Sequence, residues 1–137
     1  MRKKLKEIIY AQGYPNAEAA PIVNLEDFFE GNTDEGSIGC NLLDHPGIKK
    51  FYDVLINIRE KANVQGVFVE IMEMEDGVDY WAFSERVYIL TNAENSSVEE
   101  WVTDLEPSEV DEGYAFGVPE IAPKLFEGYK VYSVWWD

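Results

Sequence analysis

DHPGIKKFYDVLINIREKAN, residues 44–63, is the clearest structural signal in this chain of 137 residues. Its apolar side chains recur three and four residues apart, which is the spacing of a helix with one buried face. These side chains are Ile48, Phe51, Tyr52, Leu55 and Ile58. Asp44 and Pro46 are typical of a helix start, and Asn63 lies near the end of the pattern. The stretch therefore predicts an amphipathic helix.

Two strand patterns follow this helix. Residues 67–72 alternate between two sets of side chains, and residues 81–91, WAFSERVYILT, are rich in β-branched and aromatic side chains. The dipeptide Asp76-Gly77 between them is typical of a tight turn. We expect the two strands to pair as an antiparallel hairpin.

Farther along the chain, residues 96–105 predict a second helix from apolar side chains at positions i, i+3, i+4 and i+7. Residues 106–128 are rich in proline and glycine and predict a long connection, a feature that often has a function. Residues 129–136, YKVYSVWW, are largely apolar on both sides of an extended chain. They predict a last strand that is central in its sheet or covered on both faces.

Ahead of the first helix, residues 37–43, SIGCNLL, read as a short buried strand in which Gly39 allows close approach and the Cys40 thiol is buried. Residues 1–36 read as an irregular segment with short helical turns. The order from residue 37 is strand, helix, strand, strand, helix, strand. We expect a single α+β domain over residues 1–137, with an antiparallel sheet, two main helices on one face and the ferredoxin-like βαββαβ order.

The charge of the chain is strongly unbalanced, with 27 acidic side chains against 11 basic ones. Apolar residues make up 46% of the chain and aromatic residues 14%, a composition that argues against a disordered acidic segment. The charge therefore coats a folded domain. Between Arg86 and Lys124 nine acids occur without any Lys or Arg, which argues against binding of nucleic acid. With no long apolar run, we expect a cytoplasmic protein without membrane contact.

The sequence contains few patterns for catalysis or metal binding. Cys40 and His45 are the only residues of their types, which excludes sites with two histidines or several cysteines. A nucleophile pair of these two is weighed against a role of His45 in the helix start. Residues 30–36, EGNTDEG, resemble a calcium loop, but Glu35 and Asn41 occupy positions where an EF-hand needs Gly and Glu. We therefore assign no catalytic residue, cofactor or metal, and lean against an enzyme.

Three phrases resemble a family of small acidic bacterial proteins: LEDFFEGNTDEGSIGCNLL, WAFSERVYILT and YSVWWD. The resemblance covers nearly the whole chain from Pro21 onward. It implies a bacterial cytoplasmic protein. It brings no activity, cofactor or catalytic residue with it.

Two functional hypotheses follow, beside a third interpretation in which the charge only keeps the domain soluble. The first is a protein-binding module of immunity or inhibitor type, whose acidic face docks onto a basic partner protein. The second is a small enzyme or ligand-binding domain with an aromatic and acidic pocket. The sequence leaves the oligomeric state open. The candidate partner-binding residues are Glu94, Glu99, Glu100, Asp104, Glu106, Glu109, Asp111, Glu112 and Trp136.

Overall fold

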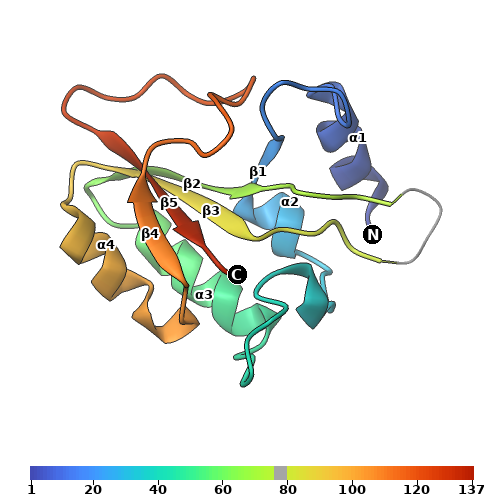
Figure 1. Cartoon of the computed structure of the whole chain (residues 1–137), viewed down its shortest axis with the longest axis horizontal. Coiled ribbons are helices and arrows are strands. Elements are labelled where there is room, and N and C mark those ends of the chain that lie inside the picture. Colours follow the sequence, from blue (N-terminus) through green and yellow to red (C-terminus); the bar gives the residue numbers. More distant parts are fainter. Residues whose placement is uncertain (76–79) are drawn as a thin grey trace.

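The structure is a computed structural model that describes residues 1–75 and 80–137, and it has an α+β architecture (Figure 1). The strands form one antiparallel sheet, and the helices pack against it. In chain order the elements are α1 (Lys3–Ala11), β1 (Ile22–Asn24), α2 (Leu25–Phe29), η1 (Glu35–Ser37), α3 (Ile48–Arg59), β2 (Val64–Glu70), β3 (Arg86–Thr91), α4 (Asn95–Trp101), η2 (Thr103–Leu105), β4 (Glu109–Glu112) and β5 (Lys130–Trp135). The predicted α+β class and antiparallel sheet are confirmed.

The strands lie in the order β1-β2-β3-β5-β4, and every neighbouring pair is antiparallel. The predicted hairpin is the β2–β3 pair, whereas its Asp76-Gly77 turn lies outside the described residues. The second half contains one split βαβ unit, because β5 separates β3 from β4, the strands on either side of α4, but β4 is not among the strands of the predicted ferredoxin-like order. In the first half β1 and β2 are direct neighbours, although α2 and α3 lie between them in the chain.

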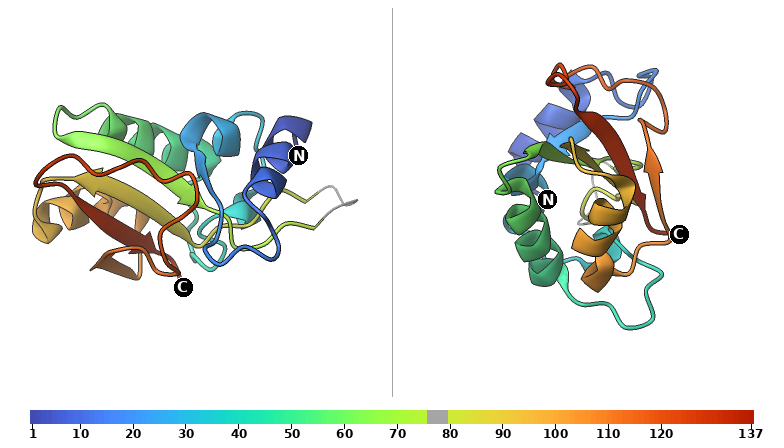
Figure 2. Two further views of the ribbon diagram at one scale, coloured as in Figure 1. Left: turned by 90° about the horizontal axis from the view of Figure 1, so that it is seen from above. Right: turned by 90° about the vertical axis from the view of Figure 1, so that its left-hand side faces the viewer.

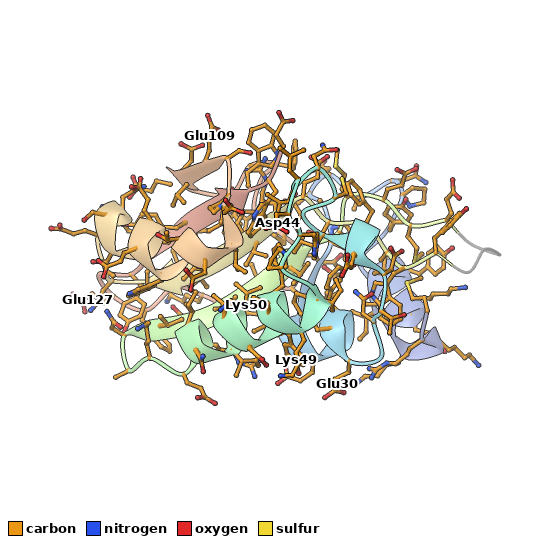
Figure 3. The ribbon with its side chains drawn as sticks, turned by 90° about the horizontal axis from the view of Figure 1, so that it is seen from below. Glu30, Asp44, Lys49, Lys50, Glu109 and Glu127 are labelled. Carbon is orange, nitrogen blue, oxygen red and sulfur yellow. The ribbon has the colours of Figure 1, made fainter. Side chains whose placement is uncertain are left out.

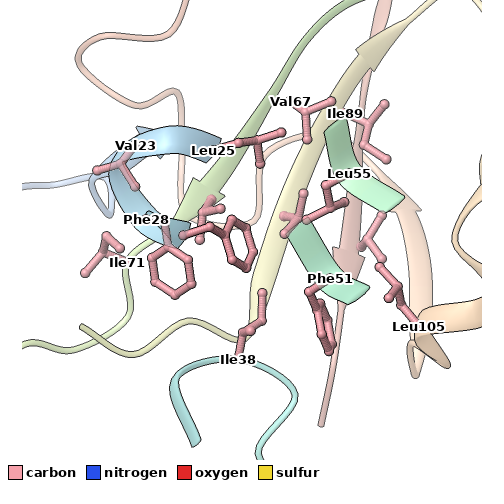
Figure 4. Packing of buried hydrophobic residues seen from close by; sticks show 14 of the residues in the cluster. Val23, Leu25, Phe28, Ile38, Phe51, Leu55, Val67, Ile71, Ile89 and Leu105 are labelled. Carbon is pink, nitrogen blue, oxygen red and sulfur yellow. The ribbon is translucent and has the colours of Figure 1, made fainter. Parts of the chain in front are cut away.

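One face of the sheet is covered by α2, α3 and α4, as the two views of Figure 2 show. Phe51 and Leu55 of α3 are fully buried and pack in one cluster with the inward side chains of the strands. Figure 4 shows Val67 of β2 and Ile89 of β3 in this cluster, with Leu105 at its end. This apolar layer is the main core.

The opposite face of the sheet is covered by the long connection between β4 and β5. Tyr88 and Leu90 of β3 and Val131 of β5 are buried there, packed against Tyr114 of the connection. The side chain of Gln65 binds the backbone of the same connection. Its amide N–H donates to the Lys124 carbonyl oxygen at 2.7 Å, and its amide oxygen accepts from the Phe126 N–H at 2.9 Å. The last strand is therefore covered on both faces, as its apolar sequence predicts.

The predicted strand over residues 37–43 is wrong. Only Ile38 makes a β-bridge, to Ser84, and the chain then turns at Gly39, whose φ is +65°. A Cβ at Gly39 would lie 2.8 Å from Cζ of Phe51, so close packing against α3 selects glycine here. Because the chain leaves the core at this turn, Cys40 is exposed, and the expectation of a buried thiol is also wrong.

The N-terminal segment is more regular than expected. Leu5 and Ile9 anchor α1 in the core, both fully buried. The side chain of Gln12 then caps the edge of the sheet at β1: the Ile22 N–H donates to it at 3.0 Å, and its amide donates to the Ile22 carbonyl at 2.8 Å. These two bonds satisfy the backbone of a short edge strand, so residues 1–36 are not merely irregular.

The predicted connection over residues 106–128 contains a strand that the sequence analysis missed. Glu109–Glu112 pairs with β5 and forms the second edge of the sheet. Its sequence, EVDE, has little strand propensity, since acidic side chains are depleted in strands. Pairing with the apolar β5 overrides the local preference.

Candidate functional site

The predicted acidic surface is built from α4, η2 and β4. Val98 and Val102 face the core, which leaves the side chains of Glu99 and Glu100 exposed on the outer side of α4. Glu106 follows η2 with a φ of +50°, a left-handed conformation that redirects the chain toward β4. This turn places the end of α4 beside the edge strand.

A groove with a volume of about 490 Å³ lies between these elements. We call it the acidic groove. Four of the predicted residues line it, together with two hydroxyl-bearing side chains and two apolar ones. The lining residues are Glu99, Thr103, Glu106, Pro107, Ser108, Glu109, Val110 and Asp111.

The other predicted acids lie around this groove rather than in it. Glu112 forms an ion pair with Lys130 at 3.0 Å, and this carboxylate raises the pKa of Lys130. Glu94 lines a smaller cavity of about 190 Å³ beside the same pair. Asp104 approaches Lys50 at 3.7 Å, and Glu100 is exposed.

Trp136, which the sequence analysis predicts to bind a partner, is buried in the core rather than presented on the surface. Its side chain is 2% exposed, and its ring packs 5.4 Å from the ring of Phe51. Its indole N–H donates to the Leu105 carbonyl at 2.8 Å. Trp136 therefore supports the groove from below, because Leu105 directly precedes Glu106. Trp135, on the other face, is half-buried beside Arg86.

The walls of the acidic groove are held by polar contacts. The side-chain amide of Asn95 donates to the Val110 carbonyl at 3.2 Å and so ties the start of α4 to β4. The Thr103 hydroxyl donates to the Glu99 carbonyl at 2.9 Å. Lys61 lies 5.0 Å from the ring centre of Trp101 and fixes the far side of α4 to the end of α3.

The carboxylates of the acidic groove are not paired with any cation among the described residues. In the part of the chain that the structure describes, Glu99, Glu106, Glu109 and Asp111 form no ion pair within 4 Å, while only their neighbours Asp104 and Glu112 do. Figure 3 shows Glu109 pointing away from the body of the molecule. Like charges gathered around a concave surface produce a negative potential there.

A second polar cluster, which the sequence analysis missed, lies on the loop-covered face of the sheet. The Tyr88 hydroxyl donates to the carboxylate of Glu70, and Arg86 Nε lies 3.5 Å from the same carboxylate. Burial raises the pKa of Glu70 and that of Tyr88. The Tyr88 hydroxyl also accepts the Ala115 N–H at 3.1 Å, so the cluster anchors the connection above it.

The cluster of Glu70, Arg86 and Tyr88 is best explained as structural, because its polar atoms bond to one another and to Ser133 and Ala115. The signal in the sequence is the carboxyl of Glu70 within the otherwise apolar run VFVEIM, residues 67–72. Over residues 1–75 and 80–137, no three acidic, His or Cys side chains gather in a way that could hold a metal ion. Over the same residues, no helix has the length and apolar character needed to cross a membrane.

The comparisons with known proteins place the chain in a bacterial family. The family model described as the Uncharacterized protein YfbO family matches residues 1–134. The chain belongs to this family. A protein of Escherichia coli (strain K12) described as Uncharacterized protein YfbO is 34% identical over 118 residues, which are 85% of this chain and 83% of that protein. No solved structure matches. The resemblance predicted from the sequence is confirmed. The description of the YfbO family names no activity that could be assigned to the site.

Proposed function

We propose that this YfbO family member is a cytoplasmic protein-binding module, of immunity or inhibitor type, whose acidic groove docks a basic partner protein. The observation that carries the proposal is a groove of about 490 Å³ lined by four acidic residues, none of which forms an ion pair among the described residues. Charged residues on any part of the surface keep a protein soluble, so solubility alone does not require them to line a groove.

The groove offers a Lys or Arg side chain of a partner more than charge. Pro107 and Val110 provide apolar contact for an aliphatic stem, while the carboxylates receive the cationic group. The hydroxyls of Thr103 and Ser108 add hydrogen-bond acceptors. Such complementarity raises the association rate and gives specificity.

The direct test is a variant that neutralises the groove, E99Q/E106Q/E109Q/D111N. A matched control, E35Q/D44N/E60Q/E127Q, removes the same charge from exposed positions elsewhere. The native protein is first used to isolate its partner from its own cells. Calorimetry with the purified partner is expected to show about tenfold or greater loss of affinity for the groove variant only.

The affinity for this partner is also expected to fall with added salt, because exposed charges act over only about 8 Å at physiological ionic strength. Equal losses for the groove variant and the control would mean that only net charge matters. Affinity that is unchanged by salt would contradict electrostatic docking. Either result would leave the solubilising interpretation.

A ligand-binding domain is the second candidate function, favoured by a cavity of about 270 Å³ that combines aromatic and acidic side chains. Its lining residues are Glu73, Glu75, Tyr80, Trp81 and Phe83. The indole N–H of Trp81 is buried without a hydrogen-bond partner in the described part of the chain. Quenching or shift of tryptophan fluorescence on addition of small cationic or aromatic compounds, lost in Trp81→Phe, would favour this candidate.

A further inference from the structure

The connection between β4 and β5 exposes apolar side chains next to the N-terminal segment. Phe116 is 54% exposed, Val118 is 70% exposed, and Met72, two residues after β2, is 52% exposed. Isolated apolar side chains on a surface need no explanation, but adjoining ones mark interaction surfaces. These three border a pair of cavities.

The two cavities are adjacent and share part of their lining. The first has a volume of about 210 Å³ and is lined by Ile71, Met72 and Phe116 together with residues 14–15 and 17–21. The second has a volume of about 360 Å³, includes Val118, and shares Ala17, Glu18 and Ala19 with the first. We call this surface the apolar groove. Two adjacent cavities offer places for more than one side chain of the same segment.

The apolar groove is separate from the acidic groove. It lies toward the end of the molecule where α1 and β1 are found, whereas α4 and β4 lie at the other end (Figure 1). β1 and β4 are the two opposite edges of the sheet. A ligand of the apolar groove is therefore not the docking event proposed above.

Both walls of the apolar groove are held in place by the fold. On one side the Tyr14 hydroxyl accepts the Met74 N–H at 3.0 Å and lies 3.2 Å from the Met74 carbonyl. On the other side the Ala115 N–H is bound by the buried Tyr88 hydroxyl, one residue before Phe116. A preformed groove binds with less loss of conformational entropy than a flexible one.

The charge around the apolar groove selects its occupant. Glu18 and Glu120 line it, and no Lys or Arg is among the described residues that line it. A second copy bound symmetrically would bring the same glutamates of both chains together, on proteins that each carry a net charge of −16. Anionic lipid surfaces are disfavoured for the same reason.

We propose that the apolar groove binds an extended segment of a partner protein in which apolar side chains alternate with Lys or Arg. Apolar side chains of that segment contact Phe116, Val118 and Met72. Its cations reach Glu18 and Glu120. This site goes beyond the proposed function and does not depend on it.

The experiment is an NMR titration of the full-length, ¹⁵N-labelled protein with a short synthetic peptide in which Leu and Lys alternate. Amide shifts are expected to concentrate at Ala17, Ala19, Phe116 and Val118. The same peptide with Glu in place of Lys, or with Ser in place of Leu, is expected to bind about tenfold more weakly or worse. Shifts confined to residues 99–111 would overturn the proposal in favour of simple charge attraction at the acidic groove.

Variants separate the groove from the loop that carries part of it. The double variant F116S/V118S is expected to lose peptide binding about tenfold, whereas F126S is expected to bind normally. Phe126 is 57% exposed on the same connection but does not line the groove, so it is a matched control. Because Phe116 contacts Arg86, thermal melts check that the double variant stays folded.

A third variant, E18Q/E120Q, tests the charge without touching the apolar contacts. It is expected to weaken binding of the Leu–Lys peptide while leaving the melting temperature unchanged. Equal binding by F116S/V118S, F126S and the unaltered protein would overturn the proposal. So would a dimer in sedimentation experiments that F116S/V118S dissociates, because the surface would then serve self-association.

Discussion

Two acid-rich regions of this protein differ in whether their carboxylates form ion pairs. Around α2 the acids are paired: Asp27 lies 3.2 Å from Lys4 and 3.5 Å from Arg2, and Glu26 binds Arg59 through two hydrogen bonds of 2.7 and 2.5 Å. Around the acidic groove, the four lining carboxylates form no ion pair among the described residues. Figure 3 shows the labelled Glu30 and Glu109 on opposite sides of the molecule.

The difference separates charge that forms ion pairs within the fold from charge that forms none among the described residues. Arg2 and Lys4 hold α1 against α2 through their ion pairs with Asp27. The region with the most acids has few basic residues near it, so the net charge of −16 is unevenly distributed. Repulsion within the acidic groove is relieved when a cation binds there.

The largest expected effect lies beneath the acidic groove, where packing matters more than charge. Trp136→Ala is expected to lower the free energy of unfolding by about 3–5 kcal/mol, because it empties a buried site beside Phe51 and removes the bond to the Leu105 carbonyl. Trp135→Ala is expected to cost only about 1–2 kcal/mol, since that side chain is half-buried. Urea unfolding followed by circular dichroism measures both. Equal losses would mean that the two faces of β5 are packed alike.

Much of this architecture could be predicted from sequence periodicity. The apolar spacing of residues 48–58 and the alternation of residues 67–71 are local signals, and both elements form as expected. Four of the residues that line the acidic groove were singled out by a different signal, the high density of acidic residues in this part of the sequence.

What could not be predicted depends on contacts between distant segments. β4 is a strand only because the apolar β5 pairs with it, and β1 is completed by the side chain of Gln12. The SIGCNLL segment does not form a strand, because the chain turns at Gly39, where Phe51 of α3 packs too closely for any side chain. Trp135 and Trp136 alternate as predicted, but which of the two faces the core is set by the helices above β5.

A smaller effect compares the two regions directly. Asp27→Asn is expected to destabilise by about 1 kcal/mol, because a nearly buried carboxylate loses its attraction to Arg2 and Lys4. Asp111→Asn is expected to leave stability unchanged or to raise it by a few tenths of a kcal/mol, because it removes repulsion only. Denaturant midpoints of the two variants measure the contrast. A loss of similar size for Asp111→Asn would show that the groove carboxylates also support the fold.

The smallest effect concerns pH, and two carboxyl groups give it opposite signs. The hydrogen bonds from Arg59 lower the pKa of Glu26 from 4.5 to about 2, so the native state holds this proton less tightly than the unfolded chain does. The stability that Glu26 contributes is fully present above its ordinary pKa and is lost as the pH falls toward 2. Burial raises the pKa of Glu70, so the native state holds that proton more tightly. Protonation of Glu70 therefore stabilises the fold as the pH falls through its raised pKa toward 4.5.

Thermal melts between about pH 8 and pH 3 are thus expected to pass through a maximum on the acid side of neutrality. Glu26→Gln is expected to flatten the decline at low pH, by about 1 kcal/mol at most because the pair with Arg59 is partly exposed. Glu70→Gln is expected to remove the rise that precedes it, because the amide carries no charge to bury beside Tyr88 and Arg86. A melting temperature that falls steadily from neutral pH, in the native protein and in Glu70→Gln alike, would mean that paired acids such as Glu26 govern the whole titration and that the unpaired groove contributes no repulsion.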